Sequence, residues 1–219
     1  FDRFYAGSPV CSPTRGSCLT GRHPFRSGLD WALGAGQKVR EPRLRKEERT
    51  VAQSLRNRDY ATGHFGKWHL GARAVNGRKV PTPGEHGFEE WFSTEYGVAT
   101  YDPMVVPPNI RLPKPYYFHN GALVTENLAG DTSRIIMDRA IRFIARAAND
   151  NRRFLAVIWF HAPHWPVFAT PEFVRYYREL APGYQADPVQ WPVPIGRIHA
   201  RCFPDGRIVV VRAAGNARC

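Results

Sequence analysis

The stretch DTSRIIMDRAIRFIARAANDNRRFLAVIWF, residues 131–160, decides the fold. Its first part, Asp131–Ala148, sets apolar residues at helical spacing against arginine and aspartate, which predicts an amphipathic helix. The predicted apolar stripe comprises Ile135, Ile136, Ala140, Ile141, Phe143, Ile144 and Ala147. The second part, Phe154–Phe160, is a continuous apolar run, which is typical of a strand buried on both faces. A helix that leads into such a strand indicates an α/β fold with a largely parallel sheet flanked by helices.

The chain before residue 131 repeats this alternation. Glu48–Asn57 carries apolar residues at helical spacing after Thr50, which can cap the helix. Tyr60–Phe65 has the pattern of a second buried strand. Ala72–Phe118 is rich in proline, glycine and aromatic residues and shows little periodicity, so we expect a long, irregular but packed excursion there.

A further helix is expected near the N-terminus. Ser12 can act as its N-cap, and Pro13 suits the first helical position, where its missing N–H costs nothing. These signals predict a helix over Pro13–Leu19 and place Cys11 just before its N-terminus. Unpaired N–H groups and a partial positive charge at such an end attract anions. A nucleophile at position 11 would therefore meet an anion that is already bound.

The composition of the sequence changes near residue 184. Pro171–Leu180 is a short helix candidate, whereas residues 184–219 are rich in arginine and spaced prolines, with one strand-like run at Ile208–Val211. We expect a partial domain over residues 1–183 and an unassigned tail over 184–219, for which a non-native reading frame is one hypothesis. The chain begins at Phe1 instead of Met, so we expect a fragment of a longer protein.

Charge and composition narrow the classes of partner. The 31 Lys and Arg residues outnumber 19 Asp and Glu, and the formal net charge of +12 favours anionic partners. The arginines are scattered and form no nucleic-acid motif, and no apolar run approaches the 18 residues of a membrane span. We therefore expect no nucleic-acid and no membrane partner. The four cysteines lack metal-knuckle spacing; they are Cys11, Cys18, Cys202 and Cys219.

Three short motifs carry chemically active side chains. The first is Cys11-Ser12-Pro13-Thr14-Arg15, followed by Leu19-Thr20-Gly21-Arg22. The second is Gly66-Lys67-Trp68-His69-Leu70-Gly71, which follows one predicted strand. The third is His161-Ala162-Pro163-His164-Trp165-Pro166, which follows the other. Ligands of open α/β sheets bind at the carboxyl ends of strands, where these last two motifs lie.

The motifs resemble the signatures of the formylglycine-dependent sulfatases, of arylsulfatase-like and N-acetylgalactosamine-6-sulfatase-like type. The first looks like C-x-P-x-R with its L-T-G-R extension, the second matches G-K-W-H-L-G without a departure, and the third is similar to an apolar strand followed by a-P-H-x-P. The resemblance runs from about Phe1 to Leu180. It implies an alkaline-phosphatase-like α/β fold, of which this chain holds the N-terminal and middle part.

The resemblance also implies an activity, that of a sulfuric ester hydrolase. In that family a separate formylglycine-generating enzyme oxidises the cysteine, so Cys11 would become the formylglycine (3-oxoalanine) nucleophile. One hydroxyl of the hydrated aldehyde attacks sulfur, and the other later expels sulfate. By the same resemblance Arg15 would hold an oxygen of the modified residue, Lys67 would bind sulfate oxygens, and His69 would contact the formylglycine and help to regenerate it.

The third motif leaves one assignment open. The residue that matches the family histidine is His164, which would contact the sulfate and could protonate the leaving alcohol. His161 also precedes an x-Pro pair, so the assignment could slip by three residues. We interpret Arg22 and His64 as structural residues and Cys18 as a packing residue.

The resemblance further implies a bound divalent cation, usually Ca²⁺. Such a hard cation takes several oxygen ligands, of which the formylglycine at position 11 supplies one. The family's acidic pairs have no match: Asp2 lies too close to Cys11, and Asp205 sits in a turn without a following Asn. We therefore expect the other metal ligands to be absent from this chain and the chain by itself to be inactive.

Two alternatives to a sulfatase stay open. One is a phosphonate or phosphate monoester hydrolase of the same superfamily, because the same nucleophile can serve phosphorus. The other is a non-catalytic, polyanion-binding relic. The expected partners are a sulfated ester, with a sulfated glycan and a small aryl ester equally open, and the formylglycine-generating enzyme. A secreted or periplasmic compartment is compatible with the full-length family, but the sequence fixes neither this nor the oligomeric state.

Overall fold

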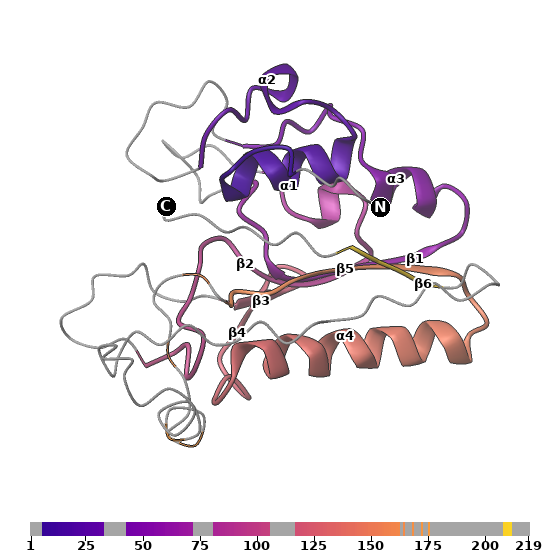
Figure 1. The fold of residues 1–219 in the computed structure, drawn as a ribbon. Helices are drawn as coiled ribbons and strands as arrows, with labels where there is room; N and C mark the ends of the chain where they lie inside the picture. The colour runs from indigo at the N-terminus through magenta and orange to yellow at the C-terminus, as the bar shows by residue number, and fades with distance from the viewer. Residues whose placement is uncertain are drawn as a thin grey trace.

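The computed structural model describes residues 6–32, 43–71, 81–105 and 117–162, residues 164, 168, 172 and 175, and the backbone of 208–211. A central sheet separates two layers of helix (Figure 1). One face carries α1 (Cys11–Thr20), α2 (Pro24–Ser27) and α3 (Val51–Arg56), and the other carries α4 (Thr132–Asn149). This arrangement confirms the prediction of an α/β fold with helices on both faces of the sheet.

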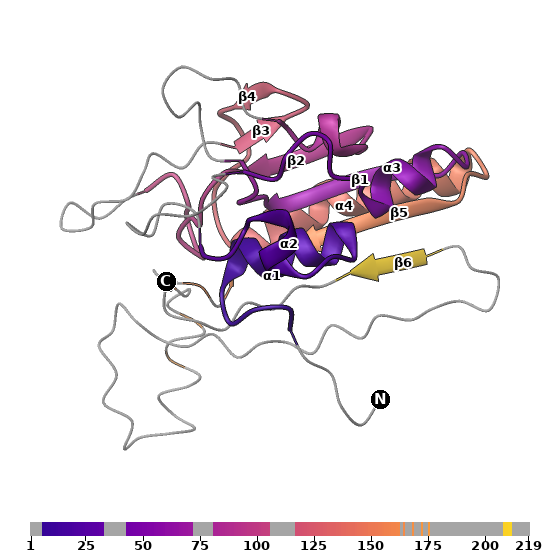
Figure 2. The same ribbon diagram turned by 90° about the horizontal axis from the view of Figure 1, so that it is seen from above.

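The sheet has six described strands in the order β4-β3-β2-β1-β5-β6. Their bounds are β1 Ala61–Lys67, β2 Glu90–Thr94, β3 Tyr117–His119, β4 Ala122–Val124, β5 Phe154–Trp159 and β6 Ile208–Val211. The strand β1 runs parallel to both β2 and β5, and β6 runs parallel to β5. The short β3 and β4 add an antiparallel edge at the far end, as Figure 2 shows. The sheet is thus parallel at its centre and mixed overall.

The helix and strand of residues 131–160 form as predicted. Asp131 caps α4 by accepting hydrogen bonds from the backbone N–H groups of Ser133 and Arg134. All six residues of β5 are buried. The apolar stripe of α4 is narrower than predicted, because the side chain of Ile141 is 53% exposed. The core beneath α4 is formed by Ile136, Ala140, Phe143, Phe65 of β1 and their neighbours.

The helix α1 and its N-cap begin two residues earlier than predicted. Val10 is the N-cap residue, with no side-chain cap, and Cys11 is the first residue of the helix. The hydroxyl of Thr14 instead bonds both the carbonyl and the N–H of Ser8, which ties the preceding turn to the helix start. Ser12 is therefore not the cap. The predicted cap of α3 is confirmed, since Thr50 and Gln53 form a reciprocal capping box.

The predicted irregular excursion Ala72–Phe118 contains regular structure. It includes a short 3-10 turn, η2 (Gly84–His86), and the strand β2 beside β1. Phe92 of β2 packs in the core under α4, whereas Ser93 faces the other side and contacts His64. This strand is hard to recognise in the sequence because polar residues occupy some of its buried positions. Hydrogen bonds within the fold satisfy their polar groups. The strand β1 also extends to Lys67, two residues beyond the prediction.

Two predictions fall largely outside the described residues. These are the helix over Pro171–Leu180, where the structure describes only Glu172 and Arg175, and the tail over 184–219, where it describes only the backbone of β6. That strand confirms the strand-like run at Ile208–Val211. None of the helices in the described part of the chain is long and apolar enough to cross a membrane.

Candidate active site

The first two motifs meet where α1 begins and β1 ends. Cys11 Sγ lies 3.1 Å from His69 Nδ1, although 58 positions separate them in the sequence. Both side chains are buried, Cys11 at 6% exposed and His69 at 5%. His69 has a left-handed backbone with φ of 53°, which a residue other than glycine adopts at some cost. The folded chain therefore sustains backbone strain to hold this imidazole against position 11.

Arg15 lies one helical turn after Cys11 and is buried beneath the same site. Its Nη1 donates a 2.6 Å hydrogen bond to the carbonyl oxygen of Lys67, the last residue of β1. Its guanidinium carbon lies 4.6 Å from the ring centroid of Trp159, the last residue of β5. Arg15 thus joins α1 to the ends of two neighbouring parallel strands.

The site carries a concentrated positive charge. Lys67 is 2% exposed and Arg15 is 4% exposed, so both cations are shielded from water. Burial, followed by the charges of Lys67, Arg15 and His164, holds the pKa of His161 well below its usual range. His161 therefore stays neutral at physiological pH and adds no third fixed charge to this group. Two buried cations beside a helix N-terminus make an environment that favours an anion.

The two histidines of the third motif occupy different environments. His161 is 1% exposed, and its Nε2 lies 3.4 Å from the hydroxyl of Thr94. His164 is only half-buried, and its backbone N–H donates a 2.7 Å hydrogen bond to the carbonyl of His161. A substrate can reach a half-buried imidazole more easily than one enclosed by protein. The environments therefore support the interpretation of His164 as the substrate-facing residue.

The structure joins the predicted residues in pairs. Cys11 contacts His69 and Arg15 donates to Lys67, while His164 donates a backbone hydrogen bond to His161, whose pKa Lys67 and Arg15 help to lower. Sequence reasoning did not identify residues 94–97, which form a wall beside His69, His161 and His164. Thr94 contacts His161, the ring of Tyr96 packs 5.8 Å from His69, and a Cβ at Gly97 would lie 3.1 Å from Nδ1 of His164. Recognising β2 would have indicated this wall, because parallel neighbours end at the same edge.

The described residues do not make a cation site by themselves. They contain no group of three or more His, Cys, Asp or Glu that could hold a metal ion. The wall itself contains one carboxyl group, that of Glu95, and burial raises its pKa to about 8. A carboxyl that is mostly protonated at neutral pH is a poor ligand for Ca²⁺. The chain's described part therefore offers position 11 and lacks the acidic partners that a hard cation needs.

Two residues near the site are structural, as interpreted from the sequence. Arg22 donates a 2.7 Å hydrogen bond to buried Glu48, which also accepts from Arg45 at 2.8 Å. Burial raises the pKa of Glu48, but the two arginines more than offset it and hold that pKa below its usual range. Cys18 packs against the core between the sheet and α1, and burial raises the pKa of its thiol.

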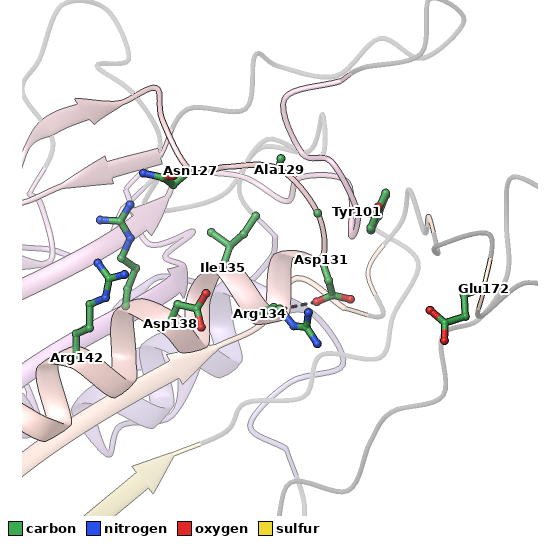
Figure 3. Close-up of a pocket in the computed structure, with 11 residues that line it drawn as sticks. Tyr101, Asn127, Ala129, Asp131, Arg134, Ile135, Asp138, Arg142 and Glu172 are labelled. Carbon is green, nitrogen blue, oxygen red and sulfur yellow. Dashed lines mark hydrogen bonds between the residues drawn. The ribbon is translucent and has the colours of Figure 1, made fainter.

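A pocket of about 780 Å³ lies along α4, on the face of the sheet opposite α1 (Figure 3). Its lining combines three arginines with three acidic residues: Arg134, Arg139, Arg142, Asp131, Asp138 and Glu172. The charges of that lining balance, in contrast to the cationic group around Arg15 and Lys67. None of the five predicted site residues lines it.

Comparison with known proteins identifies a family. The sulfatase family model matches residues 1–188. The N-acetylgalactosamine-6-sulfatase of Homo sapiens is 30% identical over 186 residues, which cover 80% of this chain and 34% of that protein. The chain thus spans about a third of the length of the curated relatives it matches.

Solved structures agree in fold. The structure of Ps i-CgsB in complex with k-i-k-neocarrahexaose has a TM-score of 0.66 and 23% identity, and covers 80% of this chain and 40% of that chain. The PsFucS1 sulfatase from Pseudoalteromonas sp. has a TM-score of 0.57 and 21% identity, and covers 77% of this chain and 37% of that chain. The predicted alkaline-phosphatase-like fold is confirmed. From its three motifs, its fold and the family match over residues 1–188, the chain belongs to the sulfatase family.

Proposed function

We propose that the protein to which this chain contributes hydrolyses sulfate monoesters, with a formylglycine derived from Cys11 as the nucleophile. The observation that carries the proposal is the placement of Cys11 at the first position of α1, against His69 and above the Arg15–Lys67 contact. An unmodified thiol would form a stable thiosulfate ester, whereas a hydrated aldehyde can attack with one hydroxyl and expel sulfate with the other. Cys11 Sγ marks the place where the oxygens of the modified residue would lie.

Each residue of the site has a task that its geometry allows. The buried charge of Lys67 attracts the sulfate oxygens, and the N-terminus of α1 adds unpaired N–H groups. Arg15 ties α1, which carries position 11, to the ends of β1 and β5. His69 lies within hydrogen-bond distance of position 11, so it can take a proton there. His164, half-buried at the rim, can donate a proton to the leaving alcohol.

A sulfated glycan is the substrate class that we favour over a small aryl ester. The human relative is named for a sulfated sugar, and the structure of Ps i-CgsB contains a carrageenan-type oligosaccharide. The excess of cationic residues in this chain also suits a polyanionic chain of sugars. The cation that the family holds is expected to be bound by residues beyond those described here, because the described residues do not supply its ligands.

The modification of Cys11 is the first test. The whole protein would be expressed with and without a formylglycine-generating enzyme, and the peptide that contains Cys11 analysed by mass spectrometry. We expect loss of the thiol mass and gain of aldehyde reactivity, together with hydrolysis of an aryl sulfate that Cys11→Ala lacks. An untouched cysteine would instead favour the polyanion-binding relic.

The second test compares the two atoms that the nucleophile could attack, sulfur and phosphorus. Rates on matched aryl sulfate and aryl phosphonate esters would be measured with the same aldehyde-bearing preparation. We expect sulfate to be the faster substrate. A clear preference for the phosphonate would replace the sulfatase with the phosphonate or phosphate monoester hydrolase of the same superfamily.

A further inference from the structure

The indole ring of Trp159 packs against the guanidinium group of Arg15. The indole is 0% exposed, and the guanidinium carbon of Arg15 lies 4.6 Å from its ring centroid. A cation–π contact of a desolvated arginine is stronger than one at an exposed position. Trp159 lies outside the three motifs, so its contribution is visible only in the folded chain.

The indole is itself held in place on its other sides. The ring of His64 meets it edge-on at a centroid distance of 5.1 Å, and the ring of Trp68 stacks on it at 6.3 Å. His64 Nδ1 lies 2.6 Å from the hydroxyl of Ser93, which orients the imidazole. Burial and the charge of Arg15 hold the pKa of His64 well below its usual range. A neutral His64 does not compete with Arg15 for the π-face of Trp159.

The contact complements the hydrogen bond between Arg15 and Lys67. That bond ties one guanidinium nitrogen to the end of β1, while the ring packs against the guanidinium carbon. An arginine side chain otherwise loses rotamer entropy when it is held in one orientation. A flat, rigid partner that is already fixed by the core reduces this cost, because the position of the guanidinium is defined before substrate arrives.

We propose that Trp159 is a positioning residue for the reaction, which holds the guanidinium of Arg15 in the orientation used at position 11. The inference rests on the proposed function. Trp159 contacts Arg15, so it acts on position 11 through that residue. Its replacement should lower the rate of turnover through loss of order in Arg15 and leave the aldehyde and the substrate-binding charge of Lys67 unchanged.

The experiment compares Trp159→Leu, Trp159→Phe and a matched control, Phe88→Leu, in the whole aldehyde-bearing protein. Phe88 is 2% exposed, packs in the same aromatic cluster as Trp159 and contacts His64. We expect Trp159→Leu to lower kcat for an aryl sulfate roughly 30-fold, the equivalent of about 2 kcal/mol, with a smaller change in KM. Trp159→Phe should recover most of that loss, and Phe88→Leu should retain kcat while it loses thermal stability.

A double-mutant cycle separates positioning from packing. We expect Trp159→Leu to have little further effect on kcat when Arg15 is already alanine, and the two substitutions to be coupled at least about fivefold in the unfolding equilibrium constant. Wild-type kcat in Trp159→Leu, or an equal loss with and without Arg15, would overturn the proposal. If the aldehyde-bearing wild type hydrolyses no sulfate ester, the proposed function fails. The coupling in unfolding then decides the matter by itself: its presence would support the hold of Trp159 on Arg15, and its absence would refute it.

Discussion

Gly66 and Trp159 are paired in register on neighbouring parallel strands, and their backbones approach so closely that a Cβ at Gly66 would overlap the carbonyl oxygen of Trp159. Gly66 also has φ of 108°, which residues with a side chain rarely adopt. The first glycine of the motif Gly66–Gly71 therefore allows β1 and β5 to bring Lys67 and Trp159 to the same edge.

Gly66→Ala should destabilise the protein by more than about 3 kcal/mol, because backbone strain and overlap with a main-chain atom add together. The matched control is Gly21→Ala, where φ is 67° but nothing lies within 4 Å of the added Cβ. That change should cost about 1–2 kcal/mol, from the left-handed backbone alone. Urea unfolding measures both, and equal losses would show that the close approach to Trp159 has no energetic importance.

Arg15→Lys keeps the charge but loses the planar group that contacts both the Lys67 carbonyl and the Trp159 ring. We expect kcat for an aryl sulfate to fall roughly 100-fold, since the loss of one oriented donor in an active site has this effect. Steady-state kinetics on preparations with equal aldehyde content test this. Retention of kcat in Arg15→Lys would mean that charge alone is sufficient at this position.

Glu95 should make the protein less stable as the pH rises. Its pKa is raised from 4.5 to about 8 by burial, so between these values the folded state binds the proton more tightly than the unfolded state. Stability is complete below the unfolded value and is lost as the pH rises towards about 8. Glu95→Gln should remove this slope and stabilise the protein at pH 8 by at least about 1 kcal/mol. The control is the exposed Glu47→Gln, and parallel stability curves for the two variants would contradict the assignment.

Glu48 should have the opposite pH dependence. Arg45 and Arg22 outweigh burial and lower its pKa, so its contribution is complete above the unfolded value of 4.5 and is lost as the pH falls through the folded value. Glu48→Gln should cost roughly 1–2 kcal/mol at pH 7, discounted because the arginines are 42% and 44% exposed. Unfolding curves at several pH values should show the difference from wild type shrinking in acid. A difference that is constant with pH would point to packing instead of charge.

His164 and His161 can be separated by the leaving group. If His164 protonates the leaving alcohol, His164→Asn should slow esters of poorly acidic alcohols by roughly 100-fold and activated aryl sulfates much less. His161→Asn should mainly reduce stability, because His161 is buried beside Thr94. Rates on a series of esters with different leaving groups measure this. A leaving-group dependence that appears only in His161→Asn would move the assignment by three residues.

The segment 131–160 could be predicted from sequence because its signals are local. The helical spacing of Ile136, Ala140 and Phe143 and the apolar run of β5 each depend on neighbours a few positions away. The motif residues Cys11, Lys67 and His69 were likewise readable, because side-chain chemistry at fixed spacing is a property of the sequence. The fold class and the family followed from these features.

Tertiary structure alone decided the rest. Polar residues at Ser93 and Thr94 conceal β2, since their burial becomes favourable only when His64 and His161, far along the chain, lie within hydrogen-bond distance. The apolar run that contains Trp159 likewise gives no indication that its ring contacts Arg15. The sequence also does not distinguish the enclosed His161 from the half-buried His164. These features depend on strand register and on contacts between distant segments, which hydrophobic periodicity within a short window does not contain.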